Sequence, residues 1–415
     1  RFGRPLAQTQ IACPRGWRTL DDTPIEPYLA TCSRTVYAEP QDPNRYIHNR
    51  VAKATSYEIV NTLGKRITDM AAIKDPNPEL KVIGQTLSFY DGEPFIGLPL
   101  GQVDRFGAVM RTESFVLTDE ILKDAYGTAI PPYLEPTGNP TWTADYPAEF
   151  RTLLPNRAGY SFHPGSADPT DLRGYFVNAD RRRYDFQTEL KGRGLMLEAL
   201  DPLHDTRVNP SAHRTLVTYD KYQFLPIEVT DAAGLTMQAV YDYRLLQPTE
   251  VIDPNENKSL FTFTPLGLLA TSFVRGKTPT EGDQNRPSVR MEYRFLAFDE
   301  SPPENRQPIF VRSIRHTHHD TELDVPLPER DETITTVEYS DGFGRVLQTR
   351  TQGEEVRFGD EQFGGGETLL PVKQSDGAGG DVVGRKNTDP RNPNVVVSGW
   401  QIYDNKGQVV EKYEP

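Results

Sequence analysis

The chain is patterned by short runs in which apolar and polar residues alternate, separated by clusters of turn-forming residues. Typical runs are 214–219, 225–231 and 346–351, which are rich in Val, Leu, Ile, Thr and Tyr. Successive side chains of a β-strand point to opposite faces of a sheet, so this alternation indicates strands with one face more exposed than the other. We therefore expect an all-β protein.

One short pattern recurs between these runs, in which an Asp or Asn is followed three residues later by Gly. An Asp or Asn side chain caps a turn by hydrogen-bonding the backbone two residues on. Gly closes a short hairpin because it adopts positive φ at little cost. We predict strand–turn–strand units whose structural turn residues are Asn61 and Gly64, Asp104 and Gly107, Asp231 and Gly234, Asp341 and Gly344, and Asp404 and Gly407.

The repeats are densest between residues 214 and 275, where two short strands recur with a period of roughly 20 residues. No helical stretch separates these strands, so they are expected to pair antiparallel as a meander. Helix signals are few. The best is 118–127, with Thr118 as N-cap, acidic residues in the first turn and Gly127 at the end.

These signals divide the chain into three parts. Residues 1–117 form an N-terminal β region, and 118–200 form an insertion with one short helix and Pro-rich loops. Residues 201–415 hold the repeats, interrupted by a long Gly-rich loop over 359–394 that we expect to be flexible. Two further loops are predicted over 276–289 and 299–308.

Composition narrows the class of protein. The hydrophobic content of 36% is low and the aromatic content of 10% is not, which suits sheets with exposed faces. The net charge of −13 argues against a nucleic-acid partner, and no apolar run is long enough to span a bilayer. Cys13 and Cys32 are more simply two separate thiols than a disulfide. The chain begins without Met and ends within the repeat pattern, as expected of a piece of a longer polypeptide.

Candidate reactive groups are sparse. His316 and His318 would share one face of a strand beside His319, but no third metal ligand is marked, so a polar strand face or turn is favoured. The stretch 159–163 lacks the closing Gly of a serine-hydrolase motif, and the Gly-rich stretch 377–380 lacks the Lys of a phosphate loop. A solvated strand face is the simpler interpretation of the basic run 181–183, and a position over a turn is the simpler interpretation of Trp142 and Trp400.

Several stretches resemble a known family. The dipeptides Tyr219-Asp220, Tyr241-Asp242 and Tyr403-Asp404 are similar to the repeats of RHS/YD-repeat proteins. Longer stretches resemble the RHS segment in the B component (TcB-like, SpvB/TcdB-type) of Tc-type insecticidal toxin complexes, although Asn257 stands where Gly is usual. Those stretches are 217–276, 339–345 and 399–415.

The resemblance implies a strip of antiparallel sheet that curves into part of a hollow shell. In that family the shell holds a cleaved toxin domain, which leaves through a propeller gate. The implied partners are a C-component-like RHS chain or fused toxin cargo, the propeller and SpvB-like domains of the same polypeptide, and a translocation channel. The resemblance also implies secretion in a bacterial toxin complex after cytoplasmic assembly. The family's self-cleaving site lies in the C component, so no catalytic, cofactor or metal residues are carried over.

Three functions follow as hypotheses. The first is a non-catalytic shell segment that encapsulates a toxic cargo. The second is a cell-surface adhesion or carbohydrate-binding YD-repeat module, in which Trp142 or Trp400 would contact the ligand. The third is a hydrolase on a β scaffold, which requires a clustered acid pair or a metal at His316, His318 and His319.

Overall fold

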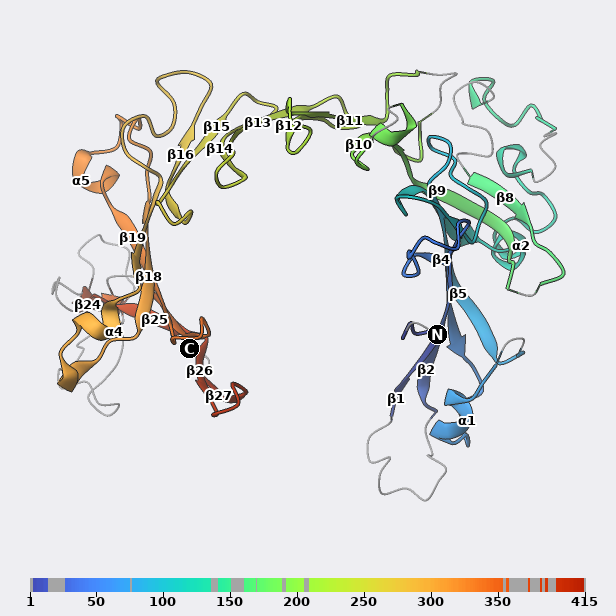
Figure 1. Cartoon of the computed structure of the whole chain (residues 1–415), viewed down its shortest axis with the longest axis horizontal. Coiled ribbons are helices and arrows are strands. Elements are labelled where there is room, and N and C mark those ends of the chain that lie inside the picture. The colour runs from blue at the N-terminus through green and yellow to red at the C-terminus, as the bar shows by residue number, and fades with distance from the viewer. Residues whose placement is uncertain are drawn as a thin grey trace. The chain divides into compact units, whose positions relative to one another are not determined.

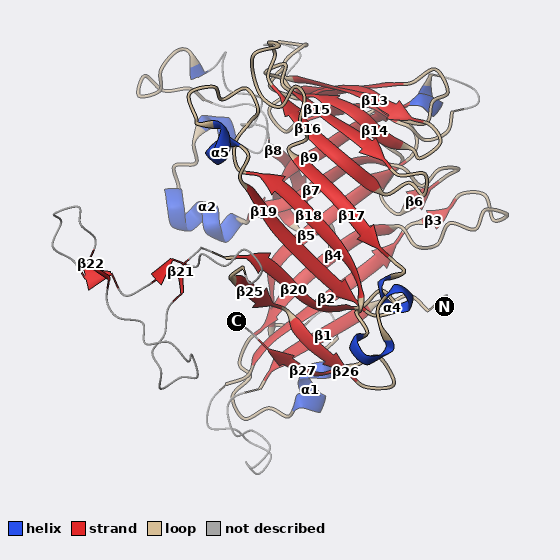
Figure 2. Ribbon diagram, turned by 90° about the vertical axis from the view of Figure 1, so that its left-hand side faces the viewer, coloured by secondary structure: helices blue, strands red, loops and turns tan. Residues whose placement is uncertain are grey.

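The structure is a computed structural model of the whole chain, and it is built almost entirely from antiparallel β-strands (Figures 1 and 2). It comprises two compact units, Arg1–Met237 and Gln238–Pro415. The residues it describes are 3–13, 27–74, 77–135, 141–150, 160–168, 170–188, 192–204, 209–353 and 393–413, together with four two-residue strands between 356 and 386. The expected all-β fold is confirmed.

In the first unit most strands pair with the next strand along the chain. The consecutive partners are β1 (Ala7–Ala12), β2 (Leu29–Tyr37), β4 (Val51–Ile59), β5 (Leu80–Tyr90), β7 (Val109–Leu117), β9 (Arg173–Tyr184), β10 (Met196–Leu200), β11 (Arg214–Tyr219) and β12 (Pro226–Thr230). The short strand β8 (Tyr160–Pro164) pairs with the first part of β9, and β10 pairs with its last part. The described strands β3 (Glu39–Pro40) and β6 (Gln102–Val103) form a small parallel pair.

The second unit is a meander. Its strands are β13 (Thr236–Asp242), β14 (Gln247–Ile252), β15 (Lys258–Phe263), β16 (Leu269–Arg275), β17 (Val289–Arg294), β18 (Ile309–His316), β19 (Thr333–Ser340), β20 (Val346–Gln352) and β25 (Val395–Ser398). The meander runs without interruption from β13 to β20 and continues with β25 after residues 353–394. A separate hairpin follows, made of β26 (Trp400–Tyr403) and β27 (Val409–Tyr413). The predicted antiparallel meander is confirmed.

The segment 118–200, predicted as an insertion, contributes to the sheet as well. It contains the expected helix α2 (Asp119–Tyr126), where the Thr118 hydroxyl accepts from Ile121 N at 3.0 Å and Gly127 has a φ of 61°. It also contains β8, β9 and β10, and β9 is a 12-residue strand with partners on both sides. The Arg run 181–183 hides the strand signal of β9, because charged residues occupy both of its faces.

Loops follow the predicted pattern in the second unit. Residues 276–288 connect β16 to β17, and the short helices α4 (Ala297–Glu300) and η5 (Pro303–Asn305) precede β18. The predicted loop 359–394 lies outside the described residues, apart from 393–394 and the two-residue strands β22 (Val372–Lys373), β23 (Asp381–Val382) and β24 (Arg385–Lys386).

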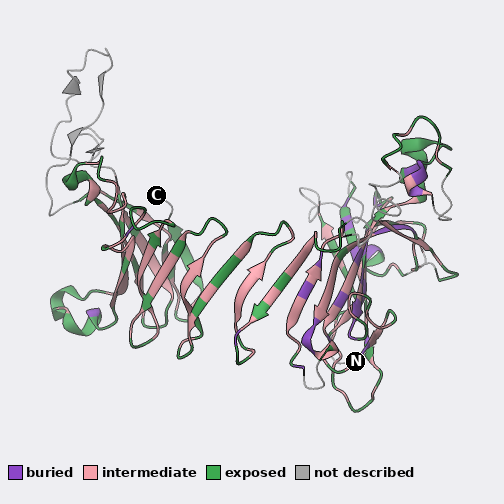
Figure 3. Cartoon of the chain, turned by 90° about the horizontal axis from the view of Figure 1, so that it is seen from above, coloured by how far each residue is buried: buried purple, intermediate pink, exposed green. Residues whose placement is uncertain are grey.

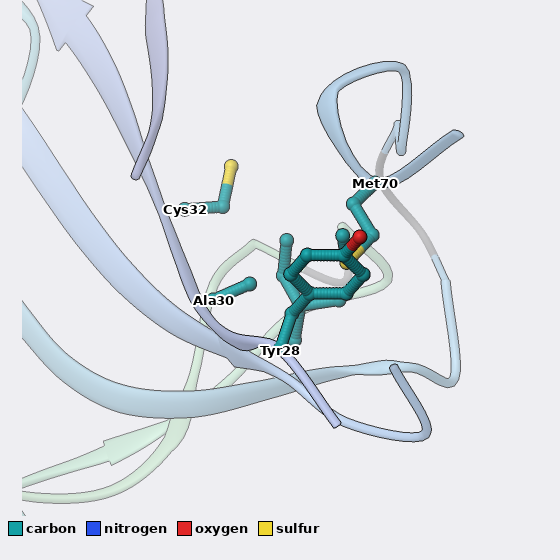
Figure 4. Close-up of a cluster of buried hydrophobic side chains, with 5 residues drawn as sticks. Tyr28, Ala30, Cys32 and Met70 are labelled. Carbon is teal, nitrogen blue, oxygen red and sulfur yellow. The ribbon is translucent and has the colours of Figure 1, made fainter. Parts of the chain in front are cut away.

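The packed core lies in the first unit. One cluster joins Tyr28, Ala30, Cys32, Ile59 and Met70 (Figure 4), and helix α1 (Ile67–Ala71) supplies its methionine. The side chain of Cys13 packs against this cluster, and both cysteines are free thiols, as expected.

The second unit has almost no buried core. Among its described residues, Ala297 is the only apolar one that is buried, and most strand residues are half-buried or exposed (Figure 3). This sheet therefore depends on strand pairing and turn closure more than on a second packed layer.

Candidate functional site

The recurring turns are the most regular feature of the chain, and most of them are closed by an aspartate. Asp231 Oδ1 accepts from Ala233 N and Leu235 N, both at 2.9 Å, while its carbonyl accepts from Gly234 N at 2.9 Å. Asp341 and Asp404 make the same contacts with the residues two, three and four positions on. One carboxylate thus satisfies two backbone N–H groups that the strand ladder leaves unpaired.

The third residue after the aspartate has positive φ in every one of these turns. The φ is 84° at Gly234, 77° at Gly344 and 78° at Gly407. An added Cβ at Gly234 or Gly344 would meet no atom within 4 Å, so the backbone conformation alone favours glycine there.

Two further turns of the same kind are absent from the predicted set. Asp253 Oδ1 accepts from Asn255 N and Asn257 N at 2.8 Å, and Glu256 takes the positive φ of 68°. The residue that stands in place of glycine is therefore Glu256, not Asn257. Thr264 closes the next turn through its hydroxyl, which accepts from Leu268 N at 3.1 Å.

Two of the predicted units are not hairpins closed by their own Asp or Asn. Asn61 has a φ of 58°, but the turn that follows leads into helix α1, because Ile67 and Met70 at helical spacing pack into the core cluster. Around Gly107, the capping carboxylate belongs to Asp91, which accepts from Asp104 N at 2.7 Å and from Gly107 N at 3.0 Å. Asp104 itself forms an ion pair with Arg45.

The Tyr-Asp dipeptides form a second recurring contact, in which the tyrosine ties one strand to its neighbour. The hydroxyl of Tyr90, at the end of β5, donates to Val51 O at 2.7 Å, at the start of β4. Tyr184 donates to Val109 O, Tyr219 to Met196 O and Tyr403 to Val346 O at 2.9–3.1 Å. Each acceptor is the first residue of an earlier strand. For Tyr90, Tyr184 and Tyr219 that strand is a paired neighbour, so the hydroxyl supports the register of the pair, whereas Tyr403 joins the separate β26–β27 hairpin to β20.

The aspartate of each dipeptide then closes the loop that follows. Asp185 is 3% exposed and accepts from Arg193 N, Gly194 N and Leu195 N at 2.7–2.9 Å. Burial raises the pKa of Asp91, while the backbone N–H groups of Ala108, Gly107 and Phe106 act in the opposite direction. Sequence reasoning missed Tyr90-Asp91 and Tyr184-Asp185, although they carry the same dipeptide signal as Tyr219-Asp220.

The histidines of the candidate cluster contact loop residues of the second unit. His316 is the last residue of β18 and its Nδ1 lies 3.0 Å from Pro287 O, whereas His318 lies beyond the strand, 2.9 Å from Glu322. The two therefore do not share a strand face. His319 Nδ1 contacts the buried Asp283 at 3.0 Å. No group of three metal-ligating side chains occurs in the described part of the chain.

The remaining candidate residues are the basic run 181–183 and two tryptophans, Trp142 and Trp400, and each makes its own local contacts. Arg181 donates to Asp201 O at 2.6 Å, and Arg182 and Arg183 form ion pairs with Asp180 and Glu198. Trp142 packs edge-on against Tyr146, with ring centroids 5.8 Å apart. Trp400 is 48% exposed, with its ring centroid 4.9 Å from that of Tyr413.

A hollow in the first unit is lined by polar and apolar side chains. Its lining includes Leu87, Phe89 and Phe176, with His163 and Gln85. His163 Nε2 lies 2.8 Å from the buried carboxylate of Glu113, which orients the imidazole. Ser161 of the partial hydrolase motif accepts a hydrogen bond from Asn178 Nδ2.

These features define a class of fold: an antiparallel strand–turn–strand meander closed by Tyr-Asp turns. Among solved structures, the crystal structure of TcdB2-TccC3 matches all of this chain with a TM-score of 0.57 and 17% identity. The structure of the Photorhabdus luminescens Tc holotoxin pore matches all of it with a TM-score of 0.57 and 16% identity. The chain covers 20% and 21% of those chains, about a fifth of their length.

At this identity the matches establish the fold, and they confirm the expected resemblance to Tc toxin components. No family model matches the sequence, and no curated protein matches it. No described helix has the length and apolar character needed to cross a membrane.

Replacing Gly344 with Val is expected to destabilise the second unit by about 1–2 kcal/mol, because a β-branched residue is forced to positive φ. Chemical unfolding and soluble yield measure the effect. The matched control is Gly342→Ala, because Gly342 lies in the same turn with open space around it and without positive φ. Equal stability of Gly344→Val and the parent would contradict the role of this glycine.

Replacing Tyr90 with Phe is expected to lower the free energy of unfolding by about 1 kcal/mol, because it removes the hydroxyl that bonds β5 to β4 and keeps the ring. Thermal or urea unfolding measures the change. Tyr46→Phe serves as the control. Tyr46 is 81% exposed, so removal of its hydroxyl should change the free energy of unfolding by no more than about 0.5 kcal/mol. A Tyr90 variant as stable as this control would argue against the tie.

Acid is expected to weaken the Asp341 turn. Desolvation raises the pKa of Asp341, but the backbone N–H and guanidinium of Arg345 bring it below its ordinary 3.8. A carboxyl with a lowered folded pKa stabilises the protein above its unfolded pKa, and this contribution is lost as the pH falls below 3.8. Unfolding midpoints measured from neutral pH to pH values below 3.8 should fall less steeply in Asp341→Asn than in the parent. The same dependence of the unfolding midpoint on pH in Asp341→Asn and in the parent would contradict the lowered pKa of Asp341.

Proposed function

We propose that this chain is a non-catalytic shell segment of a Tc-like/RHS toxin, where it helps to enclose a toxic C-terminal cargo domain before delivery. Its action is steric: the sheet separates the cargo from its surroundings, and no residue reacts. The observation that carries the proposal is the open sheet of the second unit, whose described strands lack a buried second layer. A sheet that separates a cavity from solvent needs two faces that tolerate water.

The regular turns support this role. Because turns such as those at Asp231, Asp341 and Asp404 close on their own aspartate, strands can be added without a central core. Such an array is free of the size limit of a single core. The fold shared with Tc toxin chains is in keeping with this architecture.

The proposal includes specific partners. They are a C-component-like RHS chain or a fused toxin cargo, the propeller and SpvB-like domains of the same polypeptide, and a translocation-channel component. The complex would assemble in the cytoplasm and act outside the producing cell. The chain spans about a fifth of the solved chains that it matches, so most of such a shell would come from other segments.

Protease protection of the cargo tests the proposal. The full-length protein that contains this segment is expressed together with its cargo chain, and the cargo is followed by immunoblot during proteolysis. We expect the cargo to be digested far more slowly in the complex than when free. Gly344→Val should reduce this protection and Gly342→Ala should not. Digestion at the rate of the free cargo would rule out encapsulation.

One observation favours a second candidate, a carbohydrate-binding or adhesion module. Trp400 and Tyr413 form an exposed aromatic pair on the last hairpin, and such platforms bind sugars. Glycan-array binding that is lost in Trp400→Ala would support this candidate, and absence of binding would count against it.

A further inference from the structure

The two faces of the sheet in the second unit differ in charge. Residues opposite each other on antiparallel strands point to the same face. Arg312 of β18 lies opposite Val337 of β19, which lies opposite Arg350 of β20. We call the face that carries this row the cationic face. The other face carries one arginine, Arg315, and one carboxylate, Glu338, together with Val311, Ser313, Thr336 and Thr349 on the same strands.

Strands β18, β19, β20 and β25 lie side by side (Figure 2). A depression of about 620 Å³ lies over them on the cationic face. Its aliphatic lining includes Ile314, Val337 and Val395, and Tyr339 stands at one end. Arg312 and Arg350 supply the charged groups of its lining, and the described lining contains no carboxylate. The depression therefore combines an apolar floor with positive charge.

The charge of this depression is only partly neutralised. Arg312 Nη1 lies 3.1 Å from Glu292 Oε2, but Glu292 also pairs with Arg290 at 2.9 Å, so one carboxylate faces two guanidinium groups. Arg350 lies over the ring of Tyr339 at 5.3 Å, and no ion pair joins it to a carboxylate of the described residues. A negatively charged ligand would neutralise the positive charge that remains.

We propose that this depression binds an extended acidic polypeptide segment whose carboxylates alternate with apolar side chains. The backbones of the two arginines stand two strand spacings apart, about 10 Å, which is too far for a single small anion to bridge. Carboxylates four residues apart in an extended peptide are about 13 Å apart, and the flexible arginine side chains span the difference of about 3 Å. Guanidinium groups pair with carboxylates in a bidentate manner, and the aliphatic floor between them accepts an apolar side chain. The inference goes beyond the proposed shell function and does not depend on it.

Charge favours a polypeptide over nucleic acid. A nucleic-acid site follows a phosphate backbone with a stripe of basic residues. Here only two arginines are among the described lining residues, and Glu292 stands beside one of them. An acidic peptide needs no more than the two positive groups present.

Fluorescence anisotropy tests the proposal with the whole chain. The probe is a labelled peptide of repeated Asp-Ser-Val-Ser, which places Asp and Val on the same side of an extended strand. We expect saturable binding that weakens as salt is added, and no binding of the neutral Asn-Ser-Val-Ser peptide. The double variant R312Q/R350Q should bind at least about ten-fold more weakly.

The matched control is Arg315→Gln, which removes an exposed arginine from the same strand but from the opposite face. It should bind within about two-fold of the parent. R312K/R350K, which keeps the charges, should recover much of the affinity, and circular dichroism checks that each variant is folded. Equal loss in Arg315→Gln, equal binding of the neutral peptide, tighter binding of a single-stranded oligonucleotide or no binding of the acidic peptide would each overturn the proposal.

Discussion

The structure depends on one interaction, the acceptance of loop N–H groups by an aspartate at the end of a strand. A hairpin loop leaves backbone donors that its own ladder does not satisfy, and these would otherwise weaken the pairing. Asp231, Asp341 and Asp404 satisfy two such donors each, and the buried Asp91 and Asp185 satisfy three. Short turns can therefore recur along the chain with little support from a packed core.

The tyrosine that precedes several of these aspartates adds a constraint across the sheet. Its hydroxyl donates to the first residue of an earlier strand, so the end of one strand is fixed to the beginning of another. The ladder shifts by one residue next to Tyr90, Tyr219 and Tyr403. Such bulges re-aim side chains, and here they occur where the tyrosine turns toward its acceptor.

Much of this architecture could be predicted from sequence, because it is encoded locally. The turn at Asp341 and Gly344 and the helix after Thr118 follow from residues a few positions apart. Contacts that join distant residues escaped prediction. Asp91 caps a loop more than ten residues further along, and the helix after Gly64 forms because Met70 is buried in a cluster with Tyr28. Likewise, the row of Arg312, Val337 and Arg350 exists only once three strands are in register.

The uninterrupted pairing from β13 to β20 has a consequence for how the protein forms. Each strand in this stretch finds its partner immediately before it in the chain, so the longest loops to be closed are 276–288, 295–308 and 317–332. Low contact order of this kind favours rapid folding and lets hairpins add one by one as the polypeptide leaves the ribosome. The pairing of β7 with β9 and that of β3 with β6 are different, because residues 118–172 and 41–101 must be bridged, and these longer closures are expected to be slower.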